Sequence, residues 1–306
     1  MAMRSFCLVI LLTLAASSLA QQPAFSTTVN LVPVLASVHD RNGRIVADLN
    51  QNDFVLREDG KPQTIRYFSR ETDLPLTVGL LIDTSRSQTS VLHEESQASS
   101  RFLNQVLRDK DQAFIVQFDT GVQTLQALTS SRDDLAAALQ RLMIPNQIAT
   151  LLYSAVQQSS DGILRGQPGR KALILLTDGV AYKDPRSISD AIEAAQRADT
   201  LLYSIRFSDP VHATRPLRAA FMEAMKARGK GDLERMARET GGVAYQVDAN
   251  HPIDAIYSAI EADLRNQYNI GYTPPLPAPD GRYHRIQLTT HNHDLRVDAR
   301  AGYYAR

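Results

Sequence analysis

From Leu76 to Arg265 the chain alternates between short apolar segments rich in β-branched residues and longer amphipathic segments of helical period. The segments that read as buried strands are TVGLLID, QAFIVQFD, KALILLTDG, TLLYSIRF and VAYQVD. The segments that read as helices are 94–107, TSSRDDLAAALQRL, a stretch beginning near Thr150, 188–198, DLERMARETGG and 253–265. This alternation predicts an α/β fold with a mostly parallel sheet and helices on both faces. VQTLQAL follows the preceding strand too closely for a crossover, so we expect an antiparallel edge strand there.

Both flanks of this unit are rich in strands. Residues 25–72 contain the hairpin turn signals Asn42-Gly43 and Asp59-Gly60, and residues 267–306 return to strands around the Pro-rich segment PPLPAPDG. Neither flank has enough strands for a stable sandwich alone. We therefore expect the flanks to combine into one small β-sandwich, with the α/β unit of residues 74–266 inserted between them.

The first twenty residues have the layout of a secretory signal peptide. Arg4 is followed by an apolar stretch and then by small residues ending at Ala20, where cleavage is expected. A membrane anchor would need a longer apolar run. The only cysteine, Cys7, lies in this segment, so the mature chain would have no thiol for a disulfide or a metal thiolate. The prediction is a secreted or periplasmic protein without a membrane span.

Oxygen-bearing side chains gather where the predicted strands end. Asp83, Ser85 and Ser87 follow the first buried strand, Asp178 ends KALILLTDG, and Thr150 opens a helix on the same side. The carboxyl ends of parallel strands meet at one edge of the sheet, so we expect these five side chains to converge. Carboxylates and hydroxyls are hard ligands that suit Mg²⁺ or Mn²⁺ better than Zn²⁺ or Cu²⁺. Two carboxylates would balance the ion's charge and leave one position for a partner's carboxylate.

The segments DTSRS, NQIATLLYSAV and LLTDG resemble the metal-ion-dependent adhesion site of von Willebrand factor A-type domains, over roughly residues 74–266. That family has a Rossmann-like fold and one divalent ion at the top of its sheet, so the resemblance implies Mg²⁺, or alternatively Mn²⁺ or Ca²⁺. It implies that Ser85 and Ser87 bind through their hydroxyls, and that Asp83, Thr150 and Asp178 bind directly or through water. It also implies a protein partner that supplies an Asp or Glu carboxylate to the metal.

The flanks extend the resemblance to most of the mature chain. DFVLREDGKPQTIRYFS and YNIGYTP are similar to secreted bacterial VWFA-related proteins of the acidobacterial type. The site departs from the family pattern at Arg86 and at Ile148-Ala149, where the family commonly has glycine before the serine or threonine. Thr129 and Thr177 are alternatives to Thr150. We disfavour Thr129 because it ends the edge strand, and Thr177 because strand alternation directs it away from Asp178.

Several features have a simpler explanation beside the functional one. Asp83 and Ser85 could form a turn that caps the next helix instead of holding a metal. Asp119 could bond a metal-bound water, but a turn before Gly121 is the favoured interpretation. His291 and His293 could be metal ligands, although a polar turn accounts for them better. The insertion 209–231 carries five basic residues, which form either a lip that steers an acidic partner or a solvated helix face.

Two classes of function remain. The first is a binding module in which the metal bridges the protein to a partner's carboxylate without chemistry. The second is a metal-dependent phosphohydrolase with Asp83 as nucleophile, but the acid/base carboxylate usual two residues later is replaced by Ser85. Basic and acidic residues both number 33, so no bulk field favours nucleic acid. The sequence favours the binding module over any enzyme.

Overall fold

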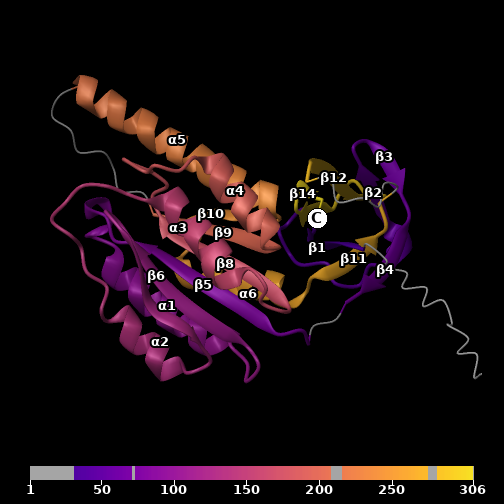
Figure 1. Ribbon diagram of the computed structural model, residues 1–306, viewed down its shortest axis with the longest axis horizontal. Coiled ribbons are helices and arrows are strands. Elements are labelled where there is room, and N and C mark those ends of the chain that lie inside the picture. The colour runs from indigo at the N-terminus through magenta and orange to yellow at the C-terminus, as the bar shows by residue number, and fades with distance from the viewer. Residues whose placement is uncertain (1–30, 71–72, 208–215, 275–280, 306) are drawn as a thin grey trace, which may run out of the picture.

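The computed structural model describes residues 31–70, 73–207, 216–274 and 281–305. An α/β part and a β-sandwich lie side by side (Figure 1). The expected signal peptide, and most of the Pro-rich segment, fall outside the described residues. No helix within the described ranges has the length and apolar character needed to cross a membrane.

Within the described residues the α/β part has one sheet with the strand order β10-β9-β8-β5-β6-β7. Its strands are β5 (Leu76–Asp83), β6 (Gln112–Phe118), β7 (Val122–Thr129), β8 (Arg170–Thr177), β9 (Thr200–Arg206) and β10 (Ala244–Gln246). All neighbours pair in parallel except β6 and β7, which pair antiparallel at the sheet edge as predicted. Every residue of β5 and β8 is buried, because helices cover both faces of the central strands.

Helices cover the two faces in two groups. The helices are α1 (Leu92–Val106), α2 (Arg132–Leu139), α3 (Leu152–Ser159), α4 (Ile188–Arg197), α5 (Pro216–Thr240) and α6 (Ile253–Arg265). Apolar residues of α1, α2 and α6 share one core with side chains of β5, β8 and β9. Residues of α3, α4 and α5 share the other core with the opposite side of the same strands. The predicted doubly wound α/β fold is therefore confirmed.

The sandwich combines strands from both flanks of the α/β part. In the described chain its sheets have the orders β13-β1-β11-β4 and β14-β12-β2-β3. The strands are β1 (Val32–His39), β2 (Phe54–Glu58), β3 (Lys61–Gln63), β4 (Ile65–Ser69), β11 (Tyr268–Tyr272), β12 (Tyr283–Thr290), β13 (Arg296–Ala299) and β14 (Gly302–Tyr304). The N-terminal β1 lies between two C-terminal strands, and β2 pairs with β12. One apolar core joins the two sheets, so the α/β part interrupts a sandwich built from both ends of the chain.

Two local elements differ from the sequence prediction. The helix expected at DLERMARETGG begins much earlier, at Pro216, so residues 216–231 of the basic insertion 209–231 are helix. Its end is as expected: Gly241 has φ +92, and its N–H and that of Gly242 donate to the carbonyl of Ala237. The Asn42-Gly43 turn is followed by an isolated bridge at Ile45 instead of a full strand.

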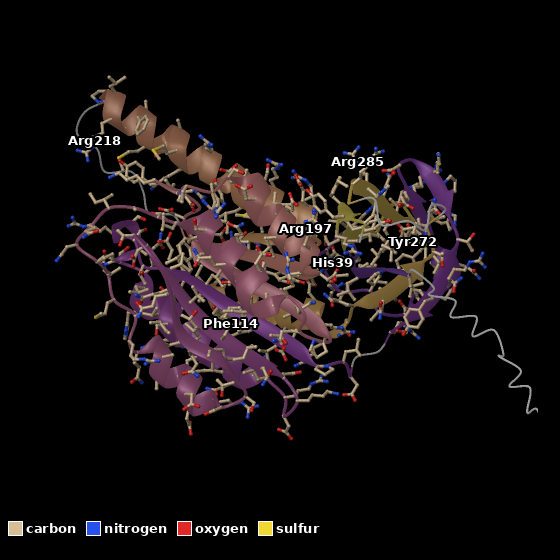
Figure 2. The ribbon with its side chains drawn as sticks, in the orientation of Figure 1. His39, Phe114, Arg197, Arg218, Tyr272 and Arg285 are labelled. Atoms are coloured by element: carbon tan, nitrogen blue, oxygen red, sulfur yellow. The ribbon has the colours of Figure 1, made fainter. Side chains whose placement is uncertain are left out.

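The sandwich meets the α/β part through polar contacts. His39 at the end of β1 lies between the two parts (Figure 2), with its Nε2 2.8 Å from Oδ1 of Asp263 on α6. Its Nδ1 lies 3.1 Å from Oδ2 of Asp298 on β13. Arg300 donates to Asp199 at 2.7 Å, which joins the other side of the junction. These contacts hold the sandwich against the side of the α/β part where the parallel strands begin. The carboxyl ends of β5 and β8 lie on the opposite side.

Candidate metal centre

Asp83 is the last residue of β5 and is fully buried. Its Oδ1 accepts a hydrogen bond from the backbone N–H of Ser85 at 2.8 Å, and its Oδ2 accepts one from the Thr177 hydroxyl at 2.6 Å. Burial, and then the nearby charge of Asp178, raise the pKa of Asp83 to about 7. A carboxylate in this position is costly unless a cation compensates its charge.

The two serines after β5 place their hydroxyls side by side. Ser85 Oγ and Ser87 Oγ lie 3.1 Å apart. With metal–oxygen bonds of about 2.1 Å, adjacent ligands of an octahedral Mg²⁺ shell lie about 3.0 Å apart. Ser85 stands at the N-cap of a short 3₁₀ turn (Arg86–Gln88), but its side chain makes no capping hydrogen bond. The Asx turn between Asp83 and Ser85 is thus present, while the serine hydroxyls are not used to cap the helix.

Asp178 follows β8, the strand next to β5. The register pairs Ile82 with Leu176, so the ends of the two strands stand at the same level. Asp178 is 6% exposed, and its Oδ1 accepts a hydrogen bond from the N–H of Val180 at 2.9 Å. Gly179 between them has φ +85, a left-handed conformation that lets the loop turn back at once. The loop thereby holds the Asp178 carboxylate beside the end of β5.

Thr150 reaches the site from a loop, two residues before α3 begins. It forms an isolated antiparallel bridge with Tyr182: each N–H donates to the other residue's carbonyl, at 2.9 and 3.1 Å. The N–H of Leu151 donates to the carbonyl of Asp119 at 3.0 Å, which anchors the loop on its other side. Thr150 is 6% exposed.

Four of the five predicted residues line one cavity of about 270 Å³. Ser85, Ser87, Thr150 and Asp178 lie on its wall, and Asp83 lies beneath, bonded to Ser85. Most of the remaining wall is apolar, and two basic side chains also line it. Those other residues are Arg86, Ile148, Ala149, Val180, Tyr182, Met222, Met225 and Lys226. The donor set fits a small hard divalent cation, because every donor is oxygen and a cation would offset the charge of the buried Asp83 carboxylate.

The alternative threonines behave differently from each other. Thr129 pairs with Ala113 at the opposite end of β6, and its Oγ1 accepts from the N–H of Ser131 at 3.0 Å. Thr177 orients a metal-ligand candidate, since its hydroxyl donates to Asp83. The alternation rule compares Thr177 only with Asp178, the next residue along the chain. It does not show that Thr177 lies beside Asp83 of the neighbouring strand β5.

Glu95 on α1 is a buried carboxylate that the sequence analysis did not single out. It is fully buried, and neither of its side-chain oxygens has a hydrogen-bond partner in the described chain. Burial, and then the charges of Asp83 and Asp178, raise its pKa well above the usual range. The signal was available, because Glu95 shares the buried stripe of α1 with Ala98, Ser99 and Phe102. Because its pKa is raised, the Glu95 carboxyl group keeps its proton to a higher pH than an exposed glutamate does.

The remaining candidates have structural roles. Asp119 forms the expected turn: one oxygen accepts from Thr84 Oγ1 at 2.6 Å, and the other accepts from the N–H groups of Thr120 and Gly121. His291 and His293 are exposed in the turn between β12 and β13, as the favoured interpretation predicted. Asp184, which the sequence analysis missed, accepts from the N–H groups of Tyr153 and Ser154 at the start of α3.

Solved structures of two other proteins resemble this chain at low identity. Proximal thread matrix protein 1 from the mussel byssus matches with a TM-score of 0.52 and 12% identity, over 68% of this chain and 50% of that one. A structure of the same protein with a zinc-occupied MIDAS motif matches with a TM-score of 0.51 and 12% identity, over 68% and 49%. The conserved hypothetical protein BatB from Bacteroides thetaiotaomicron matches with a TM-score of 0.46 and 20% identity, over 61% and 98%.

The sequence matches no curated protein. The sequence profile of the von Willebrand factor type A domain matches residues 78–253, which include most of β5, the loops of the candidate site and all the helices up to the first residue of α6. This match covers more than half of the 306 residues, and the chain therefore belongs to the von Willebrand factor type A domain family.

Proposed function

We propose that this protein is a metal-dependent protein-binding module. Asp83, Ser85, Ser87, Thr150 and Asp178 hold one divalent cation, and a partner's Asp or Glu carboxylate completes its shell. The single observation that carries the proposal is the cavity that four of these residues line, with the buried and uncompensated carboxylate of Asp83 beneath it. Mg²⁺ is the expected ion, with Mn²⁺ or Ca²⁺ as alternatives, because all donors are oxygens.

The surroundings of the cavity support an acidic partner with apolar neighbours. Arg86 and Lys226 line the same cavity as the metal ligands, so an approaching carboxylate meets positive charge before it reaches the ion. Met222 and Met225 of α5 form an apolar wall, and α5 continues outward with Leu217 and Phe221 86% and 63% exposed. The outer half of α5 extends past the rest of the molecule (Figure 1). We expect the partner to place an apolar side chain against this wall beside its metal-binding acid.

Location outside the cytoplasm is part of the proposal. It is supported by the signal-peptide pattern of residues 1–20 and by the likeness of the flanks to secreted bacterial proteins of the acidobacterial type. A protein without a thiol in its mature chain is compatible with an oxidising compartment. We propose release into the periplasm or the medium after cleavage behind Ala20.

Phosphohydrolase chemistry at Asp83 is the less supported function. A nucleophilic aspartate of that kind needs an adjacent acid/base group, and Ser85 two residues later cannot donate a proton near neutral pH. Asp83 is moreover fully buried and bonded on both oxygens by Ser85 and Thr177. Both observations favour a ligand that binds a cation over a nucleophile that attacks a substrate.

The test is a thermal titration of the purified protein with MgCl₂ and with MnCl₂ after chelation. A ligand at a hundred times its Kd stabilises the folded state by about 2.7 kcal/mol, so the wild-type Tm is expected to rise with metal concentration. Asp178→Asn is expected to lose this rise, and Asp133→Asn, an exposed aspartate of α2, to keep it. An equal metal response of wild type and Asp178→Asn would refute the site.

The partner is tested by chelator-sensitive binding. Peptides that carry one Asp or Glu beside a Leu or Phe are immobilised, and binding is measured with Mg²⁺ and with EDTA. The proposal expects binding that needs both the metal and the peptide's carboxylate, so the Asn or Gln peptide fails. Hydrolysis of a phosphate monoester by wild type, absent from Asp83→Asn, would support the phosphohydrolase instead.

A further inference from the structure

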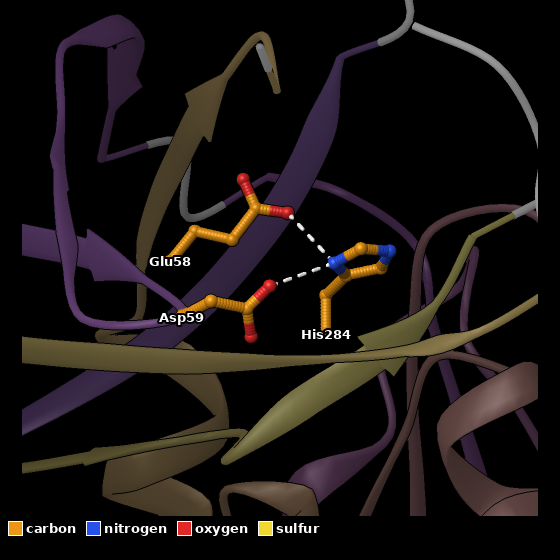
Figure 3. A group of neighbouring side chains, drawn as sticks. All are labelled: Glu58, Asp59 and His284. Carbon is orange, nitrogen blue, oxygen red and sulfur yellow. Dashed lines mark hydrogen bonds and ion pairs between the residues drawn. The ribbon is translucent and has the colours of Figure 1, made fainter. Parts of the chain in front are cut away.

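We propose a second divalent metal site in the β-sandwich, formed by Glu58, Asp59 and His284. Figure 3 shows both carboxylates directed at Nδ1 of the histidine. Asp59 Oδ2 lies 2.9 Å and Glu58 Oε1 3.5 Å from this nitrogen. One ligand atom from each residue lies within 4.8 Å of the others, and no other group of this kind occurs among the described residues. The site is independent of the proposed function, because it lies in the sandwich and shares no residue with the α/β cavity.

The hairpin between β2 and β3 fixes the two carboxylates. Asp59 has φ +48 and Gly60 φ +80, the left-handed pair of a tight two-residue turn. The N–H of Asp59 donates to the carbonyl of Arg285 at 2.9 Å, and the N–H of Arg285 donates to Oδ1 of Asp59 at 2.9 Å. Oδ1 is therefore occupied by the backbone, and Oδ2 is the oxygen that faces His284.

The Glu58 side chain lies on the core-facing side of β2, a position that an apolar residue usually occupies. It is 5% exposed and pairs across the sheet with Ile286, a member of the sandwich core. Its Oε1 accepts a hydrogen bond from the Tyr303 hydroxyl at 2.9 Å. Its Oε2 is buried and has no hydrogen-bond partner in the described chain. Burying a carboxylate with an oxygen that lacks a partner is costly, and a cation bound at Oε1 would offset the charge of the group.

The charges of the cluster do not balance without a cation. Two carboxylates face one imidazole, so the cluster carries a net negative charge even when His284 is protonated. Among the described residues, Lys61 lies near Asp59, and Arg300 lies over the Tyr303 ring at 5.7 Å. A divalent cation on neutral His284 would neutralise both carboxylates.

The spacing suits metal coordination. With metal–ligand bonds of about 2.1 Å, ligand atoms lie about 3.0 Å apart in an octahedral shell and about 3.4 Å apart in a tetrahedral one. The nitrogen–oxygen distances of 2.9 and 3.5 Å correspond to these values. One imidazole with two carboxylates favours a borderline ion such as Zn²⁺ over Mg²⁺. Tyr303 and the Arg285 N–H would orient the ligating carboxylates, as outer partners do at metal sites.

The experiment is isothermal titration with Zn²⁺ and absorption spectroscopy with Co²⁺ on the purified full chain. Wild type is expected to bind one Zn²⁺ that Asp178→Asn retains and His284→Gln loses, with affinity reduced more than about 100-fold. Tyr303→Phe, which removes only the outer hydrogen bond, is expected to weaken binding by about tenfold. His291→Gln, an exposed histidine at the end of the same strand, is the matched control and is expected to bind as wild type.

The outcomes separate the two metal sites. Co²⁺ bound by nitrogen and oxygen in a tetrahedral shell absorbs much more strongly than Co²⁺ in an octahedral all-oxygen shell, so the wild-type spectrum is expected to disappear in His284→Gln. Circular dichroism verifies that this variant is folded, and Glu58→Gln repeats the test with a nearly unchanged side-chain shape. Zn²⁺ binding that His284→Gln and Glu58→Gln leave intact, or no Zn²⁺ binding by wild type, would mean that the cluster is only an ion pair. Whether Asp178→Asn loses Mg²⁺ binding tests only the site in the α/β part, and it does not affect the conclusion about Glu58, Asp59 and His284.

Discussion

Gly179 and Gly229 pack backbone against backbone, and this contact attaches α5 to the loop that carries Asp178. A Cβ added to Gly229 would lie 2.6 Å from the carbonyl carbon of Gly179, and one added to Gly179 would lie 2.6 Å from the carbonyl oxygen of Gly229. Beyond this contact, only the C-terminal turns of α5 have apolar side chains in a core. The glycine pair therefore decides how closely the helix approaches the candidate metal site.

Gly229→Ala is expected to push α5 away from the Asp178 loop. The added methyl group overlaps backbone atoms that cannot rotate aside, and overpacking of this kind lowers the free energy of unfolding by about 1–3 kcal/mol. Because the loop holds Asp178, the Kd for Mg²⁺ is expected to rise as well. Urea unfolding and metal titration of the same sample measure both effects.

Gly231→Ala is the matched control, two residues further along the same helix. No atom lies within 4 Å of a Cβ built there. Alanine is the better helix former, so this change is expected to raise stability by up to about 1 kcal/mol and to leave Mg²⁺ affinity unchanged. Equal effects of the two substitutions would show that the Gly179 contact does not position the helix.

Thr150→Val is expected to weaken Mg²⁺ binding without unfolding the protein. Valine keeps the shape of threonine and replaces the hydroxyl of this cavity-lining residue with a methyl group. If the lost contact stabilises the bound metal by about 1.4 kcal/mol or more, the Kd for Mg²⁺ rises tenfold or more. Thr129→Val serves as the control, because Thr129 lies at the other end of the sheet and faces no predicted ligand. An unchanged Kd in Thr150→Val would remove Thr150 from the ligand set.

Features that depend on the residue pattern within one strand or helix could be predicted from the sequence. Asp83 ends one apolar strand and Asp178 directly follows another, and parallel strands end at the same edge of a sheet, so the two carboxylates were expected to lie close together. The length of α5 was not predictable in the same way, because its outer half has no core to impose an apolar period. Glu95 and the Thr177–Asp83 bond depend on which strands and helices become neighbours, and a sequence pattern along one element does not contain that information.

Thr177→Val is expected to affect both stability and metal binding. The substitution removes the hydroxyl that donates to Oδ2 of Asp83 at 2.6 Å and leaves a buried carboxylate oxygen without a donor. The loss of such a bond lowers stability by about 1–3 kcal/mol. A partner that orients a metal ligand contributes about 10–100-fold to metal affinity. Thr177→Ser retains the hydroxyl and is expected to keep the Kd within a few-fold of wild type, so equal losses in both variants would contradict this role.

His39 gives the junction between the two parts a defined pH dependence. Burial alone would lower its pKa, but contacts with Asp263 and Asp298 outweigh burial and raise the pKa of His39 from 6.5 to about 9. The folded state therefore binds the proton more tightly than the unfolded state does. The stabilisation is fully present below pH 6.5 and is lost as the pH rises through about 9.

The expected result is a fall in the free energy of unfolding of roughly 2–3 kcal/mol between pH 6.5 and 9.5, because each pKa unit corresponds to about 1.4 kcal/mol. His39→Gln is expected to be less stable at pH 6.5 and nearly flat over this window, since glutamine does not titrate there. His291→Gln, which changes an exposed histidine, is expected to follow the wild-type curve. Urea unfolding at closely spaced pH values measures all three proteins. A wild-type curve as flat as that of His39→Gln would show that the charged histidine does not hold the sandwich to α6.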